Sequence, residues 1–540
     1  MATLLSFIGD IIDSLPYLIS KYRHLPALLL LPGAAVFVPI IARQASQAAR
    51  AVAIVLASVI ILAMVWASIL YQMAPGYLDH VEPSIAAVSW WYSHGHPLYP
   101  ALDDGDGVYG LVYGPLLFQV TAAALALGPS ILLSKLPGFL GFWLACGALA
   151  WALRPLLPSA RQSLLPVAVM VLVAGGYWRA AYWVRAEPFL ILFAALASCS
   201  YIRFGRTAAA VSLGLLSGCA VNMKLHGALY ILPYAVGLLA YPASTASRVR
   251  IAAIGIGCGL FAAALPFLDP NVSLVHYVAA LRATLNHGLD RSLLIADLWF
   301  GAVLIMPFLI VAWQRVRGEV HPDRPMGLAY CACVLVVCLI GGKKGAGPTH
   351  LLPFLPLFLF FVARAAQSAR VPDNLAARSA VLPIYFLALV VAYAPSFVSN
   401  LLSLQAWDRI VDNPAFREEA TQLYAAYPTA GMGAAGGQSY ALTEYAVIGV
   451  FAGGPLVFDT TSWMDLQKDG VPEEVIQRLL VGCRTPFWII PKGGEPFTQT
   501  AAYDSDPLFS DRFRELFRQN YEPVRKGAFY DVWRCRDDRP

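Results

Sequence analysis

Charged residues are scarce in this chain. Of its 540 residues only 13% are Asp, Glu, Lys or Arg, whereas 58% are hydrophobic. Soluble domains carry roughly a quarter charged residues, so most of the chain cannot be a soluble core. The net charge of +5 is small for this length, and the basic residues lie in short clusters. This distribution argues against a nucleic-acid-binding surface.

The first 23 residues lack the features of a cleavable signal peptide. They contain Asp10 and Asp13 and no small-residue cleavage site. We expect the segment SFIGDIIDSLPYLIS to form an amphipathic helix at the membrane interface. Of the nine cysteines, seven lie in apolar segments and are predicted to be small core residues. The other two, Cys483 and Cys535, can form a disulfide if their domain lies in an oxidising compartment.

Apolar stretches of membrane-spanning length recur between residues 25 and 397. They are expected to be helices, because lipid cannot satisfy an open backbone. After residue 400 charge, Gly and Pro increase, and helical and strand patterns alternate. The segments QAWDRIVDNPAFREEATQLYAAY (405–427) and PEEVIQRLL are predicted to be helices, and PLVFD, PFWIIP and AFYDVWRC are predicted to be strands. The sequence therefore predicts an N-terminal interfacial or extra-helix region (1–50), a transmembrane domain (51–399) and a soluble α/β domain (400–540).

Clusters of arginine between the apolar segments orient the predicted spans. Basic loops stay in the cytoplasm, and these clusters recur two spans apart. The eleven spans predicted in this way lie near 51–70, 135–153, 163–177, 188–203, 207–223, 227–242, 251–267, 293–313, 326–341, 350–363 and 379–397. The segment 25–42 is either a further helix or a re-entrant piece, because Pro32 and Pro39 interrupt it. About 11 to 13 spans are thus expected, with the C-terminal domain outside.

A long first external loop, 71–134, follows from this orientation. It contains two carboxylates, Asp79 and Glu82, and an apolar segment, 109–128. A span at 109–128 would invert the alternation of basic loops downstream. We therefore expect this segment to be a helix that lies in, or dips into, the outer interface.

Other polar residues gather on the predicted outer face, at or near the ends of spans, where ionisable groups are costly and usually functional. They include Arg185, Glu187, Lys224, His226, Lys343, Lys344 and His350. A structural alternative is that Lys224 extends to the lipid headgroups and that Arg185 pairs with Glu187.

These residue types suit one chemistry. A carboxylate acts as general base on an acceptor hydroxyl, while Lys and Arg bind the phosphate of a lipid-linked donor and stabilise the leaving group. Aromatic residues of the first loop, Tyr99 and Tyr113 among them, either stack on sugar faces or form an interfacial belt. Asp79, Glu82 and Glu187 also offer oxygen ligands suited to Mg²⁺ or Mn²⁺, although no spacing requires a metal.

Several short motifs occur in an order that resembles a known family. They are YLDHVEP, GHPLYP, YGPLLF, VRAEPFLILFAALA, MKLHGALYILP and GKKGAGPTHLLPFLP. Their order resembles the GT-C glycosyltransferases, especially the branch of protein O-mannosyltransferases and lipid A aminoarabinose transferases. The resemblance covers residues 51 to 400. It departs from many relatives at the acidic pair, which is adjacent in them and is separated here by His80 and Val81.

The resemblance implies a polytopic enzyme that uses a polyprenyl-phosphate sugar and inverts the anomeric carbon. Asp79 is favoured as the base, with Glu82 positioning the acceptor or a divalent metal. The implied donor-phosphate ligands are Lys224, His226, Arg185, Lys343 and Lys344. The implied substrate-contacting residues are Glu187, Tyr99, Tyr113 and His350.

Two functions remain open at this point, a glycosyltransferase and a transporter or flippase of lipid-linked saccharides. The polar residues lie at one edge and the two halves do not match, which disfavours a transporter. The expected location is a bacterial inner membrane, with the C-terminal domain in the periplasm. The expected partners are membrane lipids, the lipid-linked donor and a glycan, lipid or protein acceptor, and no nucleic acid. A formal G-x-G-x-x-G match at GMGAAGG lacks a convincing preceding strand and is interpreted as a loop.

Overall fold

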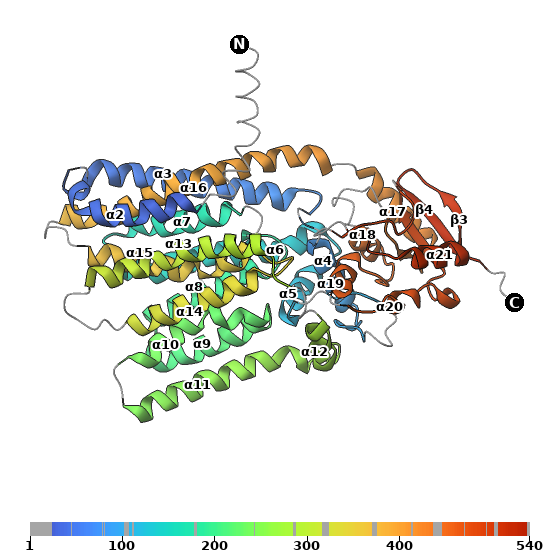
Figure 1. Cartoon of the computed structure of the whole chain (residues 1–540), viewed down its shortest axis with the longest axis horizontal. Coiled ribbons are helices and arrows are strands. Elements are labelled where there is room, and N and C mark those ends of the chain that lie inside the picture. Colours follow the sequence, from blue (N-terminus) through green and yellow to red (C-terminus); the bar gives the residue numbers. More distant parts are fainter. Residues whose placement is uncertain are drawn as a thin grey trace, which may run out of the picture. The chain divides into compact units, whose positions relative to one another are not determined.

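The computed structural model describes residues 24–44, 46–77, 79, 81–101, 107–110, 113–177, 181–241, 244–283, 288–315, 323–369, 375–411, 414–435, 445–468, 470–492, 494–501 and 506–536. Its contacts divide the chain into two units (Figure 1). The helical unit comprises Met1–Gln72, Gly138–Ala264 and Leu289–Trp407. The mixed unit comprises Met73–Pro137, Leu265–Gly288 and Asp408–Pro540. The first loop thus groups with the C-terminal segment.

The helical unit is built from long helices joined by short turns. Its α-helices are α2 (Leu25–Gln44), α3 (Ser46–Met73), α6 (Ile131–Leu153), α7 (Leu164–Gly175), α8 (Glu187–Arg203), α9 (Arg206–Val221), α10 (Leu232–Ala240), α11 (Thr245–Ala264), α13 (Arg291–Arg315), α14 (Arg324–Gly341), α15 (Leu355–Ser368) and α16 (Leu375–Val411). Short 3₁₀ helices adjoin several of them: η1 (Arg154–Leu156), η2 (Ala160–Ser163), η4 (Leu225–Tyr230) and η6 (Pro348–Phe354). Another 3₁₀ helix, η5 (Leu265–Leu268), follows α11 in the chain and belongs to the mixed unit. The helices α3, α6 and α16 run across the unit boundary.

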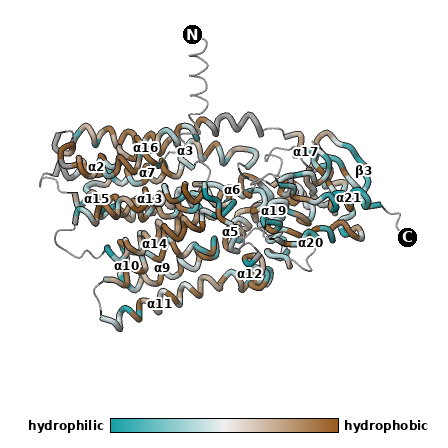
Figure 2. The backbone as a smooth tube through the Cα atoms, viewed as in Figure 1, coloured by the Kyte–Doolittle hydropathy of each residue, from teal (hydrophilic) through white to brown (hydrophobic). Residues whose placement is uncertain are grey.

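The helices of this unit expose large apolar side chains and bury small ones, as expected for helices that face lipid. On α3 the large side chains of Val55, Leu62 and Trp66 are exposed, whereas small Ala53 and Ala57 are buried. Such a helix packs through small residues and gives its bulky apolar residues to the lipid. Figure 2 shows that hydrophobic residues cover most of the length of these helices. The helical unit therefore has the surface of a membrane-embedded bundle.

Seven helices in the described part of the chain are long and apolar enough to cross a membrane. They are Gln47–Met73, Ile131–Leu156, Thr245–Leu268, Arg291–Gln314, Arg324–Gly341, Pro348–Ser368 and Ser379–Leu402. The other four predicted spans are also helical but shorter, with 12 residues in α7, 17 in α8, 16 in α9 and 9 in α10. The segment 25–42 lies within the helix α2, so its prolines do not break it.

The apolar segment 109–128 is not a spanning helix. Its helix, α5 (Pro115–Leu125), has 11 residues. Such a helix is about 16 Å long at 1.5 Å per residue. A bilayer core is about 30 Å thick, so α5 cannot cross it alone. The length of α5 agrees with the expectation that this segment is not a span.

The mixed unit combines short helices with a four-stranded sheet. Its α-helices are α4 (Val81–Ser93), α5, α12 (Leu274–Ala283), α17 (Pro414–Ala426), α18 (Tyr445–Phe451), α19 (Thr460–Lys468), α20 (Glu474–Gln477) and α21 (Asp511–Asn520), with the 3₁₀ helix η8 (Val481–Cys483). The sheet has the order β1 (Gly431–Met432), β2 (Phe487–Pro491), β4 (Tyr530–Cys535) and β3 (Tyr521–Lys526). Strand β1 is parallel to β2, and the other pairs are antiparallel.

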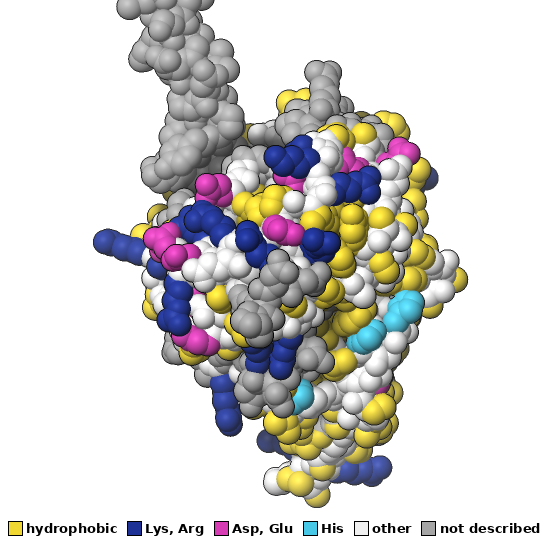
Figure 3. All heavy atoms as spheres, turned by 90° about the vertical axis from the view of Figure 1, so that its right-hand side faces the viewer, with side chains coloured by type: hydrophobic (Ala, Val, Ile, Leu, Met, Phe, Trp, Pro, Cys, Tyr) yellow, Lys and Arg dark blue, Asp and Glu magenta, His cyan; other side chains and the backbone are white. Residues whose placement is uncertain are grey.

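The core of the mixed unit joins distant parts of the chain. Trp463, Trp488 and Phe497 pack in it, together with Val108 from the first loop. Val108 also forms a bridge with Phe458. Figure 3 shows Lys and Arg interspersed with Asp and Glu on one face of this unit. Mixed charge of this kind is typical of a water-exposed surface.

The sequence predictions for the C-terminal segment are partly confirmed. The strands predicted at PFWIIP and AFYDVWRC are β2 and β4, and the helix at PEEVIQRLL contains α20. The strand predicted at PLVFD is wrong, because Phe458 makes only an isolated bridge. The next residue, Asp459, instead accepts a hydrogen bond from Ser462 N at 3.1 Å and caps α19. The described parts of the helix predicted over 405–427 are helical, as the end of α16 and as α17 (Pro414–Ala426), while residues 412–413 lie outside the described residues.

The GMGAAGG segment forms part of the sheet. Gly431 and Met432 are β1, and no helix begins from there to Ala435, where this described stretch ends. A Cβ on Gly433 would lie 2.2 Å from the Ile490 side chain. Glycine at 433 therefore serves close packing on β2. Gly436 lies outside the described residues.

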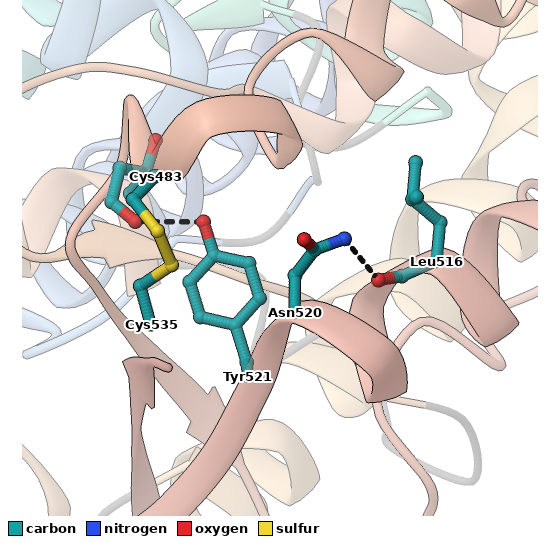
Figure 4. The surroundings of a disulfide bond; sticks show 6 residues. Cys483, Leu516, Asn520, Tyr521 and Cys535 are labelled. Atoms are coloured by element: carbon teal, nitrogen blue, oxygen red, sulfur yellow. Dashed lines mark hydrogen bonds between the residues drawn. A yellow bond between two sulfur atoms is a disulfide. The ribbon is translucent and has the colours of Figure 1, made fainter. Parts of the chain in front are cut away.

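Cys483 and Cys535 form a disulfide, with their Cα atoms 5.7 Å apart (Figure 4). It links the end of η8 to the end of β4. Beside it the Tyr521 hydroxyl donates to the Thr485 carbonyl at 2.8 Å. The other seven cysteines are free and at least partly buried, which agrees with their predicted role in packing.

Candidate active site

Five of the polar residues singled out from the sequence meet at helix ends in the helical unit. This lysine cluster consists of Arg185, Glu187, Lys224, His226 and His350. Glu187 begins α8, Lys224 precedes η4, His226 lies in η4, and His350 lies in η6. Breaks between helices leave backbone groups unpaired, so polar side chains find partners there inside an apolar unit.

Lys224 and Glu187 form the centre of the cluster. Lys224 Nζ donates to Glu187 Oε1 at 2.5 Å and lies 3.3 Å from His350 Nε2. Glu187 Oε2 also accepts from the Trp183 indole N–H at 3.2 Å. Glu187 is 1% exposed and Lys224 is 8% exposed. The alternative in which Lys224 extends to the headgroups is therefore wrong, because its ammonium is held inside the protein.

His350 is oriented from both sides of its ring. Its Nδ1 lies 3.1 Å from the Gly347 carbonyl oxygen, and its Nε2 faces Lys224. Because a carbonyl and an ammonium impose opposite roles, the contacts assign N–H to Nδ1 and the acceptor to Nε2. His226 stacks on this ring with centroids 5.4 Å apart. The pair forms one wall of the cluster.

Arg185 lies over an aromatic ring. Its guanidinium is 4.1 Å from the centroid of Trp183, the same indole that donates to Glu187. A guanidinium in this position is attracted by the ring and keeps its N–H donors directed outward from the stacked face. In place of the predicted pairing of Arg185 with Glu187, Glu187 forms an ion pair with Lys224.

Lys343 and Lys344 lie in the turn between α14 and η6. Lys343 bridges to Leu289 through its backbone, and Lys344 is exposed. Gly347 has a φ of +129°, a conformation that favours glycine. No described contact joins either lysine side chain to the lysine cluster, so their predicted part in phosphate binding stays a prediction.

The two carboxylates of the first loop lie together in the mixed unit, at the start of α4. Glu82 is fully buried, and its Oε2 accepts from Asp79 N at 3.0 Å. Asp79 is half-buried, and its Oδ1 accepts from Val81 N at 2.8 Å. Negative charge is stabilised at a helix N-terminus. Since Asp79 is the more accessible of the two, it is the better placed to meet a substrate.

Sequence reasoning missed Lys135, which is fully buried beside this loop. Its Nζ donates to the carbonyls of Ala74 at 2.8 Å and Gly76 at 2.5 Å, and it lies 5.5 Å from the Tyr77 ring. Lys135 thereby fixes the backbone that leads to Asp79. The signal was available, because a single lysine in an apolar run also marked Lys224.

Tyr99 and Tyr113 are brought together, although not around an open site. The Tyr99 hydroxyl donates to the Tyr113 carbonyl at 2.7 Å, and the Tyr99 ring is 1% exposed. It packs against Phe118 and Tyr277. A ring without an accessible face cannot stack on a sugar, so the structure does not support this role for Tyr99. Tyr113 is half-buried, and its role stays a prediction.

A metal role for Asp79 and Glu82 stays a prediction. In the part of the chain that the structure describes, no three His, Cys, Asp or Glu side chains are grouped so as to hold a metal ion. Asp79 and Glu82 lie together at the start of α4 and would provide two of the ligands of a metal ion. The structure describes the helical and mixed units each by itself, so the predicted meeting of the acids with the lysine cluster also stays a prediction.

The elements define a class, a polytopic α-helical membrane fold with a small C-terminal sheet. No family model matches the chain, and no curated protein matches it. Its fold resembles two crystal structures of ArnT from Cupriavidus metallidurans. The structure in the apo state covers 90% of this chain and 98% of that chain, with a TM-score of 0.53 and 14% identity. The structure bound to undecaprenyl phosphate covers 89% and 97%, with a TM-score of 0.55 and 14% identity.

Proposed function

We propose that this chain is a membrane glycosyltransferase that moves a sugar from a polyprenyl-phosphate carrier to an extracytoplasmic hydroxyl acceptor. The observation that carries the proposal is the lysine cluster, in which Lys224 lies between Glu187 and His350 inside an apolar unit. A buried ammonium at the ends of membrane helices suits a phosphate carried on a lipid. The shared fold with ArnT, one structure of which is bound to undecaprenyl phosphate, supports the same substrate class.

An apolar groove beside the cluster supports a lipid-linked donor. A cavity of about 540 Å³ lies between α9, α10 and α11. Its lining includes Val221 and Ala228, which bracket Lys224 in the chain. Gly214 and Gly218 pack on the backbone of α11, where an added Cβ would lie 2.2 and 2.4 Å from carbonyl oxygens. The glycines let α9 and α11 approach closely at one side of the cavity, and its lining of apolar residues suits a hydrocarbon chain.

The proposed reaction is a displacement at the anomeric carbon with inversion. The Asp79 carboxylate takes the proton of the acceptor hydroxyl as its oxygen bonds to that carbon. The bond from the anomeric carbon to the phosphate oxygen breaks, and polyprenyl phosphate leaves as an anion. Lys224 and Arg185 stabilise the charge on that phosphate. Glu82 holds the backbone of Asp79 through its contact with Asp79 N.

The mixed unit is proposed to lie in the periplasm of a bacterium, with the helical unit in the inner membrane. The Cys483–Cys535 disulfide supports this location, because such bonds persist in oxidising compartments. The acceptor class is a hydroxyl of a lipid, polysaccharide or protein outside the cytoplasm. A divalent cation bound by Asp79 and Glu82 belongs to the proposal and is tested by chelation with EDTA.

The test separates binding from chemistry. Asp79→Asn and Glu82→Gln are assayed in proteoliposomes for sugar transfer from undecaprenyl-phosphate sugars, and undecaprenyl phosphate binding is measured separately. We expect Asp79→Asn to lose turnover while it retains binding, and Lys224→Met to lose binding. Carrier-dependent transfer that is absent from the wild type, together with movement of a fluorescent lipid-linked saccharide across the bilayer, would instead identify a flippase.

A further inference from the structure

Asp297 is a buried acid that the proposed mechanism does not use. It lies in α13 and is 0% exposed. Neither of its carboxylate oxygens accepts a hydrogen bond from a described residue. A buried polar group without a partner is costly, and an ionisable residue within a membrane helix is usually functional. Asp297 therefore needs an explanation beyond packing.

The surroundings of Asp297 disfavour negative charge. A Cβ on Gly341 would lie 2.3 Å from Asp297 Oδ2 and 3.3 Å from the Gly347 carbonyl oxygen. The carboxyl group and that carbonyl thus approach one point, at the residue where α14 ends. The C-terminus of a helix carries partial negative charge. The neutral acid, whose O–H is a donor, is the form that suits these neighbours.

The Gly347 carbonyl also leads to the lysine cluster. It accepts from His350 N at 3.1 Å and lies 3.1 Å from His350 Nδ1. The other ring nitrogen of His350 faces Lys224 Nζ at 3.3 Å. A displacement of the turn 341–347, which we call the glycine turn, would therefore move His350. It would move the partner of Lys224 with it.

We propose that Asp297, as a neutral acid, is a positioning residue that donates its proton to the glycine turn at Gly347 and so orients His350 toward Lys224. The inference rests on the proposed function for its effect on the donor phosphate. It also explains why position 341 is glycine, since any Cβ there would collide with the Asp297 carboxyl. Asp297 makes no contact with substrate in this role.

Substitutions of Asp297 test the role through the binding of undecaprenyl phosphate. Asp297→Asn keeps a neutral donor, whereas Asp297→Leu keeps the branched shape and removes the donor. We expect Asn to bind undecaprenyl phosphate within about twofold of the wild type and Leu to weaken binding about tenfold, the equivalent of one lost hydrogen bond. KM for the donor should rise in Asp297→Leu more than kcat falls.

A double-mutant cycle tests whether Asp297 acts through His350. If it does, Asp297→Leu/His350→Ala should bind no more weakly than His350→Ala alone. If the losses of binding caused by Asp297→Leu and His350→Ala multiply in the double variant, the inference is overturned. Equal losses of binding in Asp297→Asn and Asp297→Leu would overturn it as well. Should Asp297→Leu fail to fold, Gly341→Ala provides the second route. Because the added Cβ would displace the Asp297 carboxyl group, Gly341→Ala should weaken the binding of undecaprenyl phosphate about as much as Asp297→Leu. Wild-type binding in Gly341→Ala would contradict the inference.

A readout that needs no ligand separates this inference from the proposed function. Diethyl pyrocarbonate modifies accessible histidine rings, and mass spectrometry gives the rate of modification at His350. This rate depends on how the His350 ring is oriented and on how accessible it is. We expect a severalfold change in Asp297→Leu and the wild-type rate in Asp297→Asn. If the modification rate of His350 is unchanged in both variants, the inference is wrong even if the wild type binds the carrier. If the wild type binds no polyprenyl phosphate, the proposed function is wrong. The modification rates test the positioning role in either case.

Discussion

The ammonium of Lys224 lies 2.5 Å from Glu187 Oε1, although the two residues start different helices. Both side chains are withdrawn from solvent, and His350 adds a second contact to the ammonium. An incoming phosphate would compete with Glu187 for Lys224. The ion pair therefore has two separable consequences, one for stability and one for binding.

Removal of either partner should destabilise the protein. Lys224→Met or Glu187→Ala leaves one buried charge unpaired, which costs about 3 to 5 kcal/mol. The double variant Lys224→Met/Glu187→Leu should recover most of that stability and still fail to bind undecaprenyl phosphate. Thermal unfolding in detergent and a binding titration check these outcomes. Lys526→Met, which changes an exposed lysine of β3 with no part in the proposed site, is the matched control.

A purely structural pair would behave differently. If Lys224 only stabilises the fold, the double variant should regain sugar transfer along with its stability. Recovered transfer would remove Lys224 from the donor site.

Lys135 should affect turnover through the backbone ahead of Asp79. Lys135→Met leaves the Ala74 and Gly76 carbonyls without their ammonium donor. We expect kcat to fall about tenfold or more, as for a lost charged hydrogen bond, with little change in KM for the donor. Steady-state kinetics measure this division. Ser134→Ala, which removes the 2.7 Å contacts of its hydroxyl with the Tyr77 hydroxyl and the Ile131 carbonyl, is the control and should lose less.

The sequence revealed the ingredients of the site more readily than their arrangement. Lys224 and His350 were identified because charge in an apolar run is costly. Their meeting with Glu187 depends on how α8, η4 and η6 pack, and no local pattern encodes that. Lys135 and Asp297 carry the same signal, because each is an ionisable residue near the start of a predicted span, 135–153 and 293–313 respectively.

The fold, like the site, could be predicted where local sequence patterns determine it and not where distant residues pair. Long apolar runs predicted the helices, and short segments rich in apolar and aromatic residues predicted β2 and β4. A similar segment, PLVFD, is not a strand. Asp459 caps α19, and the backbone of this segment pairs with the first loop around Val108. Local side-chain hydrogen bonds compete with strand pairing in this way. The partner at Val108 is too distant in the chain for a pattern to reveal.

The disulfide should supply much of the stability of the mixed unit. Cys483 and Cys535 are separated by 52 residues. Closing a loop of that length is worth about 4 kcal/mol in the chain-entropy description. Cys483→Ala/Cys535→Ala should therefore unfold at lower denaturant concentration, and a reducing agent should shift the wild type in the same way. Cys219→Ser, at a free cysteine of the helical unit, should not remove the response to reductant.

Asp459 should make the stability of the mixed unit depend on pH. Burial raises the pKa of Asp459, although hydrogen bonds from Ser462 and Ser84 oppose the shift. Its carboxyl group links α4 to α19, with Ser84 Oγ donating to Oδ1 at 2.7 Å. An acid whose pKa is raised by folding binds its proton more tightly in the folded state. The stability that Asp459 gains from binding this proton is fully present below its pKa in the unfolded chain, about 3.9. This stability is lost as the pH rises through the pKa of Asp459 in the folded protein.

Comparison with Asp459→Asn isolates this contribution, because the amide does not titrate. The difference in unfolding free energy, wild type minus variant, should increase as the pH is lowered from 7 toward 4. Urea titrations of both proteins across that range measure it. A difference that stays constant, or that shrinks toward low pH, would mean that the hydrogen bonds from Ser84 and Ser462 outweigh burial and keep Asp459 ionised in the folded protein.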